Sequence, residues 1–159
     1  MDNLSKVDHN AIRTNQTLIV SLLLVAFILN IPLLATLVGL VMLSGSAFGR
    51  PGFLPVYRRV LLPLGWVKPY VVPDHPEPHS FAQTMGGVVL LIASIAFLAG
   101  SWGLGWALAW IVILLASLNL FAGFCTGCFI YYWLGRLNVP GFTQSPPPNT
   151  FPGMRPKES

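Results

Sequence analysis

Apolar residues dominate two long stretches of this 159-residue chain, and polar residues concentrate in the three segments around them. Residues 17–49 and 81–134 contain no Asp, Glu, Lys, Arg or His. A helix needs about 20 apolar residues to cross the hydrocarbon core of a bilayer, so charge-free stretches of this length indicate membrane-embedded helices. The pattern therefore predicts an all-α membrane protein.

Each stretch is too long for one upright span and contains a turn signal. As a helix, the first would be about 50 Å long, whereas the hydrocarbon core is about 30 Å thick. Asn30 and Pro32 interrupt it, because proline lacks an amide hydrogen and ends the preceding helix. Residues 100–103 (Gly-Ser-Trp-Gly) interrupt the second stretch. We predict four short transmembrane helices in two hairpins, over residues 17–29, 33–48, 81–98 and from 104 onward.

The same pattern divides the chain into five segments. Ser80, followed three residues later by Gln83, is a capping-box pattern that predicts the start of the third helix. A cleaved signal peptide is the alternative for the first apolar run, but a second run follows at once. The predicted segments are a cytoplasmic segment (1–16), a helical hairpin (17–49), a basic and aromatic linker (50–80), a second hairpin (81–137) and a Pro-rich flexible tail (138–159).

The formal net charge of +4 is distributed in a way that predicts topology. A basic surface for nucleic acid would gather on one folded face, so three separate clusters argue against that partner. Basic residues instead mark cytoplasmic loops, which places both termini and the linker on the cytoplasmic side of a bacterial inner membrane. The nine basic residues are Lys6, Arg13, Arg50, Arg58, Arg59, Lys68, Arg136, Arg155 and Lys157.

Cys125 and Cys128 are the only cysteines of the chain. On a helix this spacing would put both on one face, about 5 to 6 Å apart and within reach of a disulfide. Such a pair can cycle between dithiol and disulfide. Gly123 and Gly127 would allow another helix or a bound molecule to approach closely. The aromatic residues 131–133 mark the inner interface, so the pair is predicted at the cytoplasmic edge of the membrane.

Other uses of the cysteine pair remain as alternatives. A c-type haem requires His directly after the second Cys, where this chain has Phe129. A zinc or iron–sulfur site needs about four ligands, and His9, His75 and His79 are predicted on the same side. Their spacing does not demand a metal, so we predict no cofactor. Simple packing of small apolar thiols is the remaining alternative.

Few polar residues lie within the predicted spans, and none is charged, so a proton or ion pathway is not predicted. Asn119 and Gln83 are the main buried polar side chains, and Asn119 is predicted to hydrogen-bond between helices. Residues 74–79 (Asp-His-Pro-Glu-Pro-His) read as an ordinary loop broken by prolines.

Three segments carry a family resemblance: residues 7–16, residues 73–83 and residues 118–128, which include Gly-Phe-Cys-Thr-Gly-Cys. Over about residues 7–137 the chain resembles a family of small bacterial membrane proteins classed as a domain of unknown function, the DUF4395 type. The resemblance implies a helical membrane protein with a thiol-redox association and no established reaction. Its polar positions imply a possible site formed by His9, Asn10, Arg13, Asn15, Gln16, His79 and Gln83, and we add Asn119 to this set.

Two functions follow as hypotheses. The first is a membrane thiol–disulfide protein in which Cys125 and Cys128 exchange electrons with a thioredoxin-like or sulfur-handling protein, or with a quinone. The second is a non-catalytic subunit of a larger respiratory or photosynthetic complex, which the short spans and glycine-rich faces also fit. A metal site with one of the histidines is a third possibility.

Overall fold

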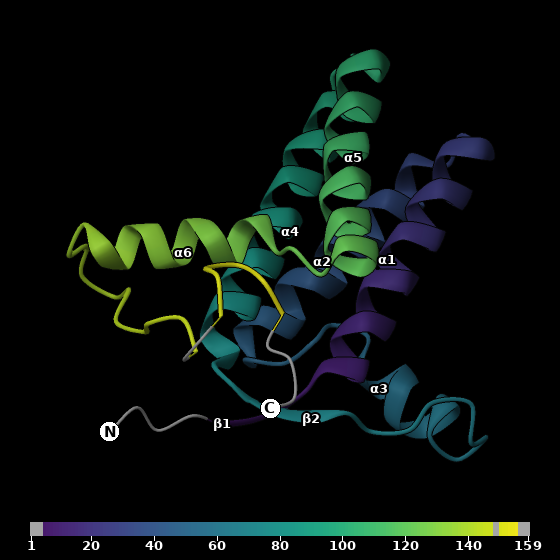
Figure 1. Cartoon of the computed structure of the whole chain (residues 1–159). Coiled ribbons are helices and arrows are strands. Elements are labelled where there is room, and N and C mark those ends of the chain that lie inside the picture. The colour runs from purple at the N-terminus through teal and green to yellow at the C-terminus, as the bar shows by residue number, and fades with distance from the viewer. Residues whose placement is uncertain (1–4, 148–149, 156–159) are drawn as a thin grey trace.

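The computed structural model describes residues 5–147 and 150–155, and helices make up most of the described chain. Four helices rise together from one end of the molecule, and a two-stranded sheet and a further helix lie near that end (Figure 1). In chain order the elements are β1 (Ser5–Asp8), α1 (His9–Ile28), α2 (Pro32–Ala47), α3 (Leu54–Val56), the π-helical turn η1 (Tyr57–Leu61), β2 (Val71–Asp74), α4 (Pro76–Leu98), α5 (Trp102–Ser117), its π-helical continuation η2 (Leu118–Ala122) and α6 (Thr126–Arg136).

The four long helices pack in a ring in which α1 contacts α2 and α5, and α4 contacts the same two helices. Their shared core combines large aliphatic side chains, such as Leu23 and Leu90, with alanines such as Ala26, Ala35 and Ala109. Small residues let helix backbones approach closely, which is the usual basis of helix packing in a membrane, where lipid tails are as apolar as the core.

The predicted breaks in both apolar stretches are confirmed. Helix α1 ends at Ile28, Asn30 adopts a left-handed conformation with φ of 51°, and α2 begins at Pro32. Gly100, with φ of 77°, separates α4 from α5. Glycine and asparagine are the residues that tolerate this backbone region best, and proline suits the first turn of a helix.

Two helices begin earlier than predicted. Helix α1 starts at His9 rather than residue 17, because the Asp8 carboxylate accepts a hydrogen bond from the Asn10 amide (3.0 Å) and caps the helix. Helix α4 starts at Pro76 rather than after Ser80, since proline is favoured at the first helical position. The predicted capping box is therefore wrong, and Ser80 lies inside α4, where its carbonyl accepts a hydrogen bond from the Thr84 hydroxyl.

The segment predicted as a basic and aromatic linker is partly regular. It contains α3, η1 and β2, and β2 pairs antiparallel with β1, with Ser5 opposite Asp74 and Asp8 opposite Val71. The short sheet ties the beginning of α1 to the beginning of α4. The pairing consequently brings the segment before α1 and the segment before α4, which are far apart in sequence, next to each other.

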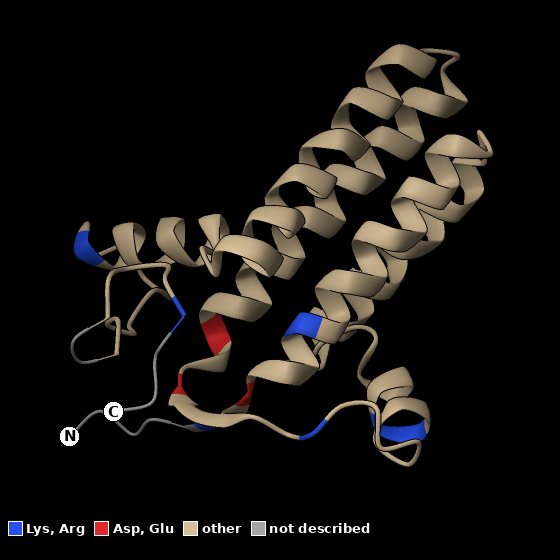
Figure 2. Cartoon of the chain, turned by 45° about the vertical axis from the view of Figure 1, so that its right-hand side comes forward, with Lys and Arg blue, Asp and Glu red and all other residues tan. Residues whose placement is uncertain are grey.

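Three helices are long and apolar enough to cross a membrane: His9–Ile28, Pro76–Leu98 and Trp102–Ala122. Helix α2 is apolar but has 16 residues, which gives about 24 Å against a hydrocarbon core of about 30 Å. The charged positions of the described residues lie at the sheet end of the molecule and on α6 and the C-terminal segment, and the far end of the four-helix bundle has none (Figure 2). Two of them lie within helices of the bundle, Arg13 in the second turn of α1 and Glu77 in the first turn of α4, because these helices extend past the apolar stretches. These features define a membrane protein.

Candidate functional site

The cysteine pair lies at the beginning of α6 and not within a continuous helix as predicted. Gly123, with φ of 68°, ends η2, and α6 then packs against α4 and projects outward from the side of the four-helix bundle (Figure 1). Cys125 is the N-cap residue of α6 and Cys128 lies in its first turn, with their Cα atoms 5.2 Å apart. The two cysteines form a disulfide. The predicted proximity is confirmed, but its structural basis is a helix N-terminus.

This position gives the two sulfur atoms different surroundings. The Cys128 amide donates a hydrogen bond to Cys125 Sγ (3.2 Å). Free amide hydrogens and the helix dipole stabilise negative charge at a helix N-terminus, and this lowers the pKa of a cysteine thiol there. Cys125 is therefore the sulfur that α6 would hold as a thiolate when the disulfide is reduced.

Cys128 faces an imidazole that is held by a buried carboxylate. His79 Nδ1 lies 3.5 Å from Cys128 Sγ, and His79 Nε2 lies 3.0 Å from Asp74 Oδ2. His9 Nε2 lies 3.1 Å from the same oxygen. These residues come from α6, α4, β2 and α1. The β1–β2 pairing holds the strand that precedes α1 against the strand that precedes α4, and the side chains of His9 and Asp74 meet beside this sheet. The result is a chain of contacts from Cys128 through His79 to Asp74 and His9.

The charge of Asp74 is fixed by this arrangement. Burial raises the pKa of the Asp74 carboxyl, but the contacts with His79 and His9 and the hydrogen bond from the His75 amide outweigh it and hold the pKa well below its ordinary value. Asp74 is thus an anion at neutral pH. Burial, followed by the negative charge of Asp74, raises the pKa of the neighbouring Tyr132, which therefore stays protonated.

An anionic Asp74 orients the His79 ring. A carboxylate that accepts a hydrogen bond from Nε2–H leaves the lone pair of Nδ1 free, and Nδ1 is the atom that faces Cys128. In this tautomer His79 can take the proton of the Cys128 thiol when the pair is reduced. His79 can return that proton when Cys128 leaves as a thiolate.

A second polar cluster ties the same end of the bundle together. The Gln83 side chain accepts a hydrogen bond from Asn15 Nδ2 (3.0 Å) and donates one to the Met42 carbonyl (2.8 Å). It also contacts the Gly52 amide and the Arg50 carbonyl, and the Phe53 amide donates to Asn15 Oδ1. Gln83 is thus satisfied by structural contacts, which fix α1, α2 and α4 around the site.

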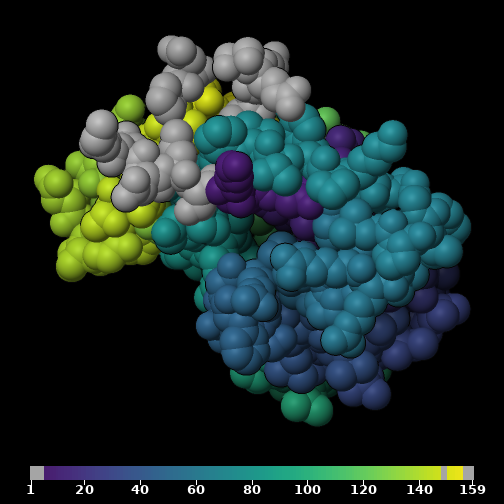
Figure 3. Space-filling model, turned by 90° about the horizontal axis from the view of Figure 1, so that it is seen from below, coloured from purple at the N-terminus to yellow at the C-terminus, as the bar shows by residue number. Residues whose placement is uncertain are grey.

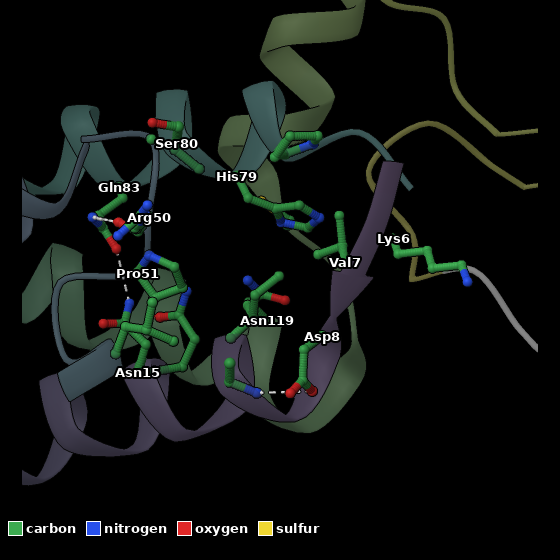
Figure 4. Close-up of a pocket in the computed structure, with 18 of the residues that line it drawn as sticks. Lys6, Val7, Asp8, Asn15, Arg50, Pro51, His79, Ser80, Gln83 and Asn119 are labelled. Carbon is green, nitrogen blue, oxygen red and sulfur yellow. Dashed lines mark hydrogen bonds between the residues drawn. The ribbon is translucent and has the colours of Figure 1, made fainter. Parts of the chain in front are cut away.

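A cavity of about 280 Å³ lies between these two clusters. Cys125 and His79 line it, as do the amides of Asn15, Gln83 and Asn119. Figure 4 shows Asn15 and Gln83 on one side of the cavity and His79 and Asn119 on the other. The basic side chains of Lys6, Arg50 and Arg58 also line it. Seen from the sheet end, the surface is hollowed between β1 and the linker (Figure 3).

Helix α6 is held against α4 by a glycine contact. A Cβ atom on Gly127 would lie 2.5 Å from Ala82 Cβ, so only glycine permits this approach. The close packing predicted for Gly127 is confirmed. Gly123 has a different role from the predicted one, because its left-handed conformation ends η2.

The described part of the C-terminal segment folds over the cysteines, although it was predicted to be a flexible tail. The Cys125 amide donates to the Gly153 carbonyl (2.8 Å), and Phe124 forms a β-bridge with Met154. The Arg155 guanidinium donates to the Asn119 carbonyl (3.2 Å). Residues 148–149 and 156–159 lie outside the described residues. The segment closes one side of the disulfide, and both cysteines are buried, with 5% and 3% of their surface exposed.

The structure brings together most, but not all, of the predicted site residues. His9 and His79 join the cysteines, whereas Asn15, Gln16, Gln83 and Asn119 line the adjoining cavity. Asn10 and Arg13 do not take part, since the Asn10 side chain donates to the Lys68 carbonyl and Arg13 is exposed. His75 occupies the N-cap position of α4 without a side-chain capping hydrogen bond, and its side chain is not part of this chain of contacts.

Sequence reasoning missed Asp74, because residues 74–79 were read as a loop. The available signal was Pro76, which is typical of a first helical position and would have placed Asp74 just before a buried helix start. The covering role of residues 153–155 had no local signal.

Two groups of side chains could hold a metal ion: His79, Cys125 and Cys128, and His9, Asp74 and His79. In each group the ligand atoms lie within 4.8 Å of one another. The first group requires reduced cysteines, because a thiolate and not a disulfide is the metal ligand. With the disulfide present, the arrangement supports redox chemistry more directly than metal binding.

The fold and the site define a helical membrane protein with a disulfide between Cys125 and Cys128 at one end of its bundle. The sequence profile of a domain of unknown function, DUF4395, matches residues 7–136. The chain therefore belongs to the DUF4395 family. Searches of the curated proteins and of the solved structures each gave no match.

Proposed function

We propose that this protein is a membrane thiol–disulfide redox protein in which Cys125 and Cys128 are the reacting pair. The observation that carries the proposal is the contact of Cys128 with the His79–Asp74 pair, combined with the position of Cys125 at the N-terminus of α6. A packing disulfide needs neither a helix N-terminus to stabilise one thiolate nor an oriented imidazole beside the other sulfur.

We further propose that all four long helices cross a bacterial inner membrane and that the charged end faces the cytoplasm. The far end of the four-helix bundle has no basic position among the described residues, and the basic positions lie toward the other end, which favours this orientation. A disulfide on the cytoplasmic side is exposed to reducing conditions, and disulfides of mesophile proteins in that compartment are usually catalytic or redox-sensing.

The proposed reaction begins with attack on Cys125, because this sulfur lines the 280 Å³ cavity whereas Cys128 faces the smaller space beneath residues 153–155. A partner thiol gives its proton to His79, which also lines this cavity, and the resulting thiolate attacks Cys125 Sγ and forms a mixed disulfide. The bond between Cys125 and Cys128 breaks, and Cys128 leaves as a thiolate that takes a proton from His79. A second partner thiolate then releases Cys125, so that the partner becomes a disulfide and the pair becomes a dithiol.

The chemistry of the cavity indicates the kind of partner. Its basic lining favours a peptide segment with acidic residues beside a cysteine pair, as a thioredoxin-like or sulfur-handling protein would present. The reverse reaction uses the same steps, with His79 taking the proton of Cys128 before Cys128 resolves the mixed disulfide.

A redox titration tests this function. The purified full chain in nanodiscs is equilibrated with dithiothreitol and glutathione buffers, and free thiols are counted with a mass tag. We expect one reversible two-electron transition at a potential within the range of thioredoxin-like proteins, about −270 to −120 mV. A pair that stays oxidised below about −300 mV would behave as a structural disulfide and would contradict the proposal.

A further inference from the structure

A second cavity approaches the cysteine pair from the membrane side. It has a volume of about 140 Å³ and lies between α4, α5 and α6. Met85, Ile111, Leu115 and Ile130 line it, and each of these side chains is 39% to 47% exposed on the apolar surface of the bundle. The cavity therefore opens toward the lipid and not toward the charged end.

The two cavities meet at the site. Asn15, Gln16, Ala82, Gln83, Asn119 and Cys125 line both of them. Cys125 thus separates a space that opens between the charged loops from a space that opens between the helices. A molecule dissolved in the membrane would reach Cys125 through the smaller cavity, while a partner at the charged end would reach it through the larger one.

The smaller cavity suits one uncharged six-membered ring. A cavity of about 150 Å³ in an apolar protein core is known to hold benzene, and this one is of similar size. Of the described residues that line it, none carries a charge. Its inner end is polar, because Gln16 and Asn119 lie there and their side-chain amides have no hydrogen-bond partner among the described residues. Amide donors at the end of an apolar slot would bind the carbonyl oxygens of a ring.

We propose that this cavity binds a membrane quinone, which reoxidises the Cys125–Cys128 dithiol; the inference rests on the proposed function of the pair. The dithiol gives up two electrons and two protons as the S–S bond forms. The quinone takes up two electrons and two protons and leaves as the quinol. His79 accepts the proton of Cys128, and the amides of Gln16 and Asn119 hold the ring carbonyls beside Cys125.

A lipid acyl chain could also enter an apolar slot, but it has no use for amide donors and cannot accept electrons. The entrance on the membrane side, the size of the cavity, the amides without a partner among the described residues and the adjacent dithiol together fit a quinone. This arrangement would connect thiol exchange at the charged end with electron carriers in the bilayer.

The test uses the full chain in nanodiscs, reduced with dithiothreitol, desalted and kept anaerobic. Ubiquinone-1 is added, because its ring is fully substituted and has no open carbon to which a thiol can add. Quinol formation is followed by absorbance, and disulfide formation by a thiol-reactive mass tag. We expect one quinol for each disulfide formed. Reoxidation by glutathione disulfide is measured in parallel, since it reports on the cysteine pair without the quinone.

Two adjacent leucines provide a matched pair of variants. Leu115 lines the cavity mouth, whereas Leu114 is 62% exposed and does not line the cavity. Leu115→Trp should slow reoxidation by ubiquinone-1 about tenfold or more, because the indole would fill the entrance and displace the ring from Cys125. Leu114→Trp, on the neighbouring lipid-facing position, should change it by less than about twofold.

The outcomes separate the two proposals. If glutathione disulfide reoxidises the pair but ubiquinone-1 does not, the quinone site is wrong and the redox function stands. If neither oxidant acts, both proposals fail. Equal rates for Leu115→Trp and Leu114→Trp would mean that the quinone reacts by another path, and this would also overturn the inference.

Discussion

Replacing Cys128 by serine is expected to trap a covalent complex through Cys125. In the reverse direction of the proposed reaction, the Cys125 thiolate attacks an oxidised partner and Cys128 resolves the mixed disulfide, so its loss leaves the Cys125–partner bond without an internal attacking group. Cys125 remains the N-cap of α6, where the helix N-terminus stabilises its thiolate. Most of the protein should therefore shift to a larger, thiol-sensitive species on non-reducing gels of intact membranes after acid quenching.

The control for this trap is Cys125→Ser, which keeps one cysteine in the same turn of α6. Both cysteines are buried, but Cys128 does not line the 280 Å³ cavity and lies beneath residues 153–155, so it should form little complex with any partner. Equal trapping by the two variants would contradict the assigned roles of the cysteines. The absence of a complex with either variant would argue against thiol exchange altogether.

The second large effect is expected for His79→Asn. Without the imidazole, the Cys128 thiol has no base within reach, and general-base assistance by a positioned side chain is typically worth about 10²-fold or more. Resolution of a preformed mixed disulfide should therefore slow by about this factor at pH 7. The rate is measured by stopped-flow release of a chromogenic thiol from Cys125.

The pH profile distinguishes this chemical role from a structural one. In the variant, resolution depends on unassisted ionisation of Cys128, whose ordinary pKa is about 8.5, so its rate should continue to rise into the alkaline range and approach that of the unaltered protein. His75→Asn is the matched control, because it removes another buried histidine and places asparagine, a good capping residue, at the N-cap of α4. If the resolution rates of His79→Asn and His75→Asn depended on pH in the same way, this result would contradict the role of His79.

Local signals in the sequence were sufficient for the architecture. The charge-free stretches predicted the helical bundle, and Asn30, Pro32 and Gly100 predicted its breaks. These features depend on residues within a few positions of each other. The CxxC spacing likewise predicted the proximity of the two cysteines, because a separation of three residues limits their distance in any turn or helix.

The rest of the site depends on contacts between distant segments. Asp74 and His9 belong to segments that the β1–β2 pairing holds together, and neither four-residue strand has a pattern strong enough to predict that pairing. The bridge between Phe124 and Met154 joins the two ends of a segment that contains α6 and then an irregular stretch, so no periodic pattern marks it. Gly123 was read as a packing position, although glycine is also the usual residue at a helix end. For this reason the cysteines were assigned to a continuous helix.

The redox state of Cys125 and Cys128 in growing cells tests the central claim most directly. Cells are quenched in acid, free thiols are labelled with a mass tag, and the two forms are compared before and after an oxidant pulse. The account predicts that the pair moves between dithiol and disulfide and returns within minutes. A pair that keeps one state throughout, with Cys125→Ser and Cys128→Ser both silent, would contradict it and would favour a structural subunit of a larger membrane complex.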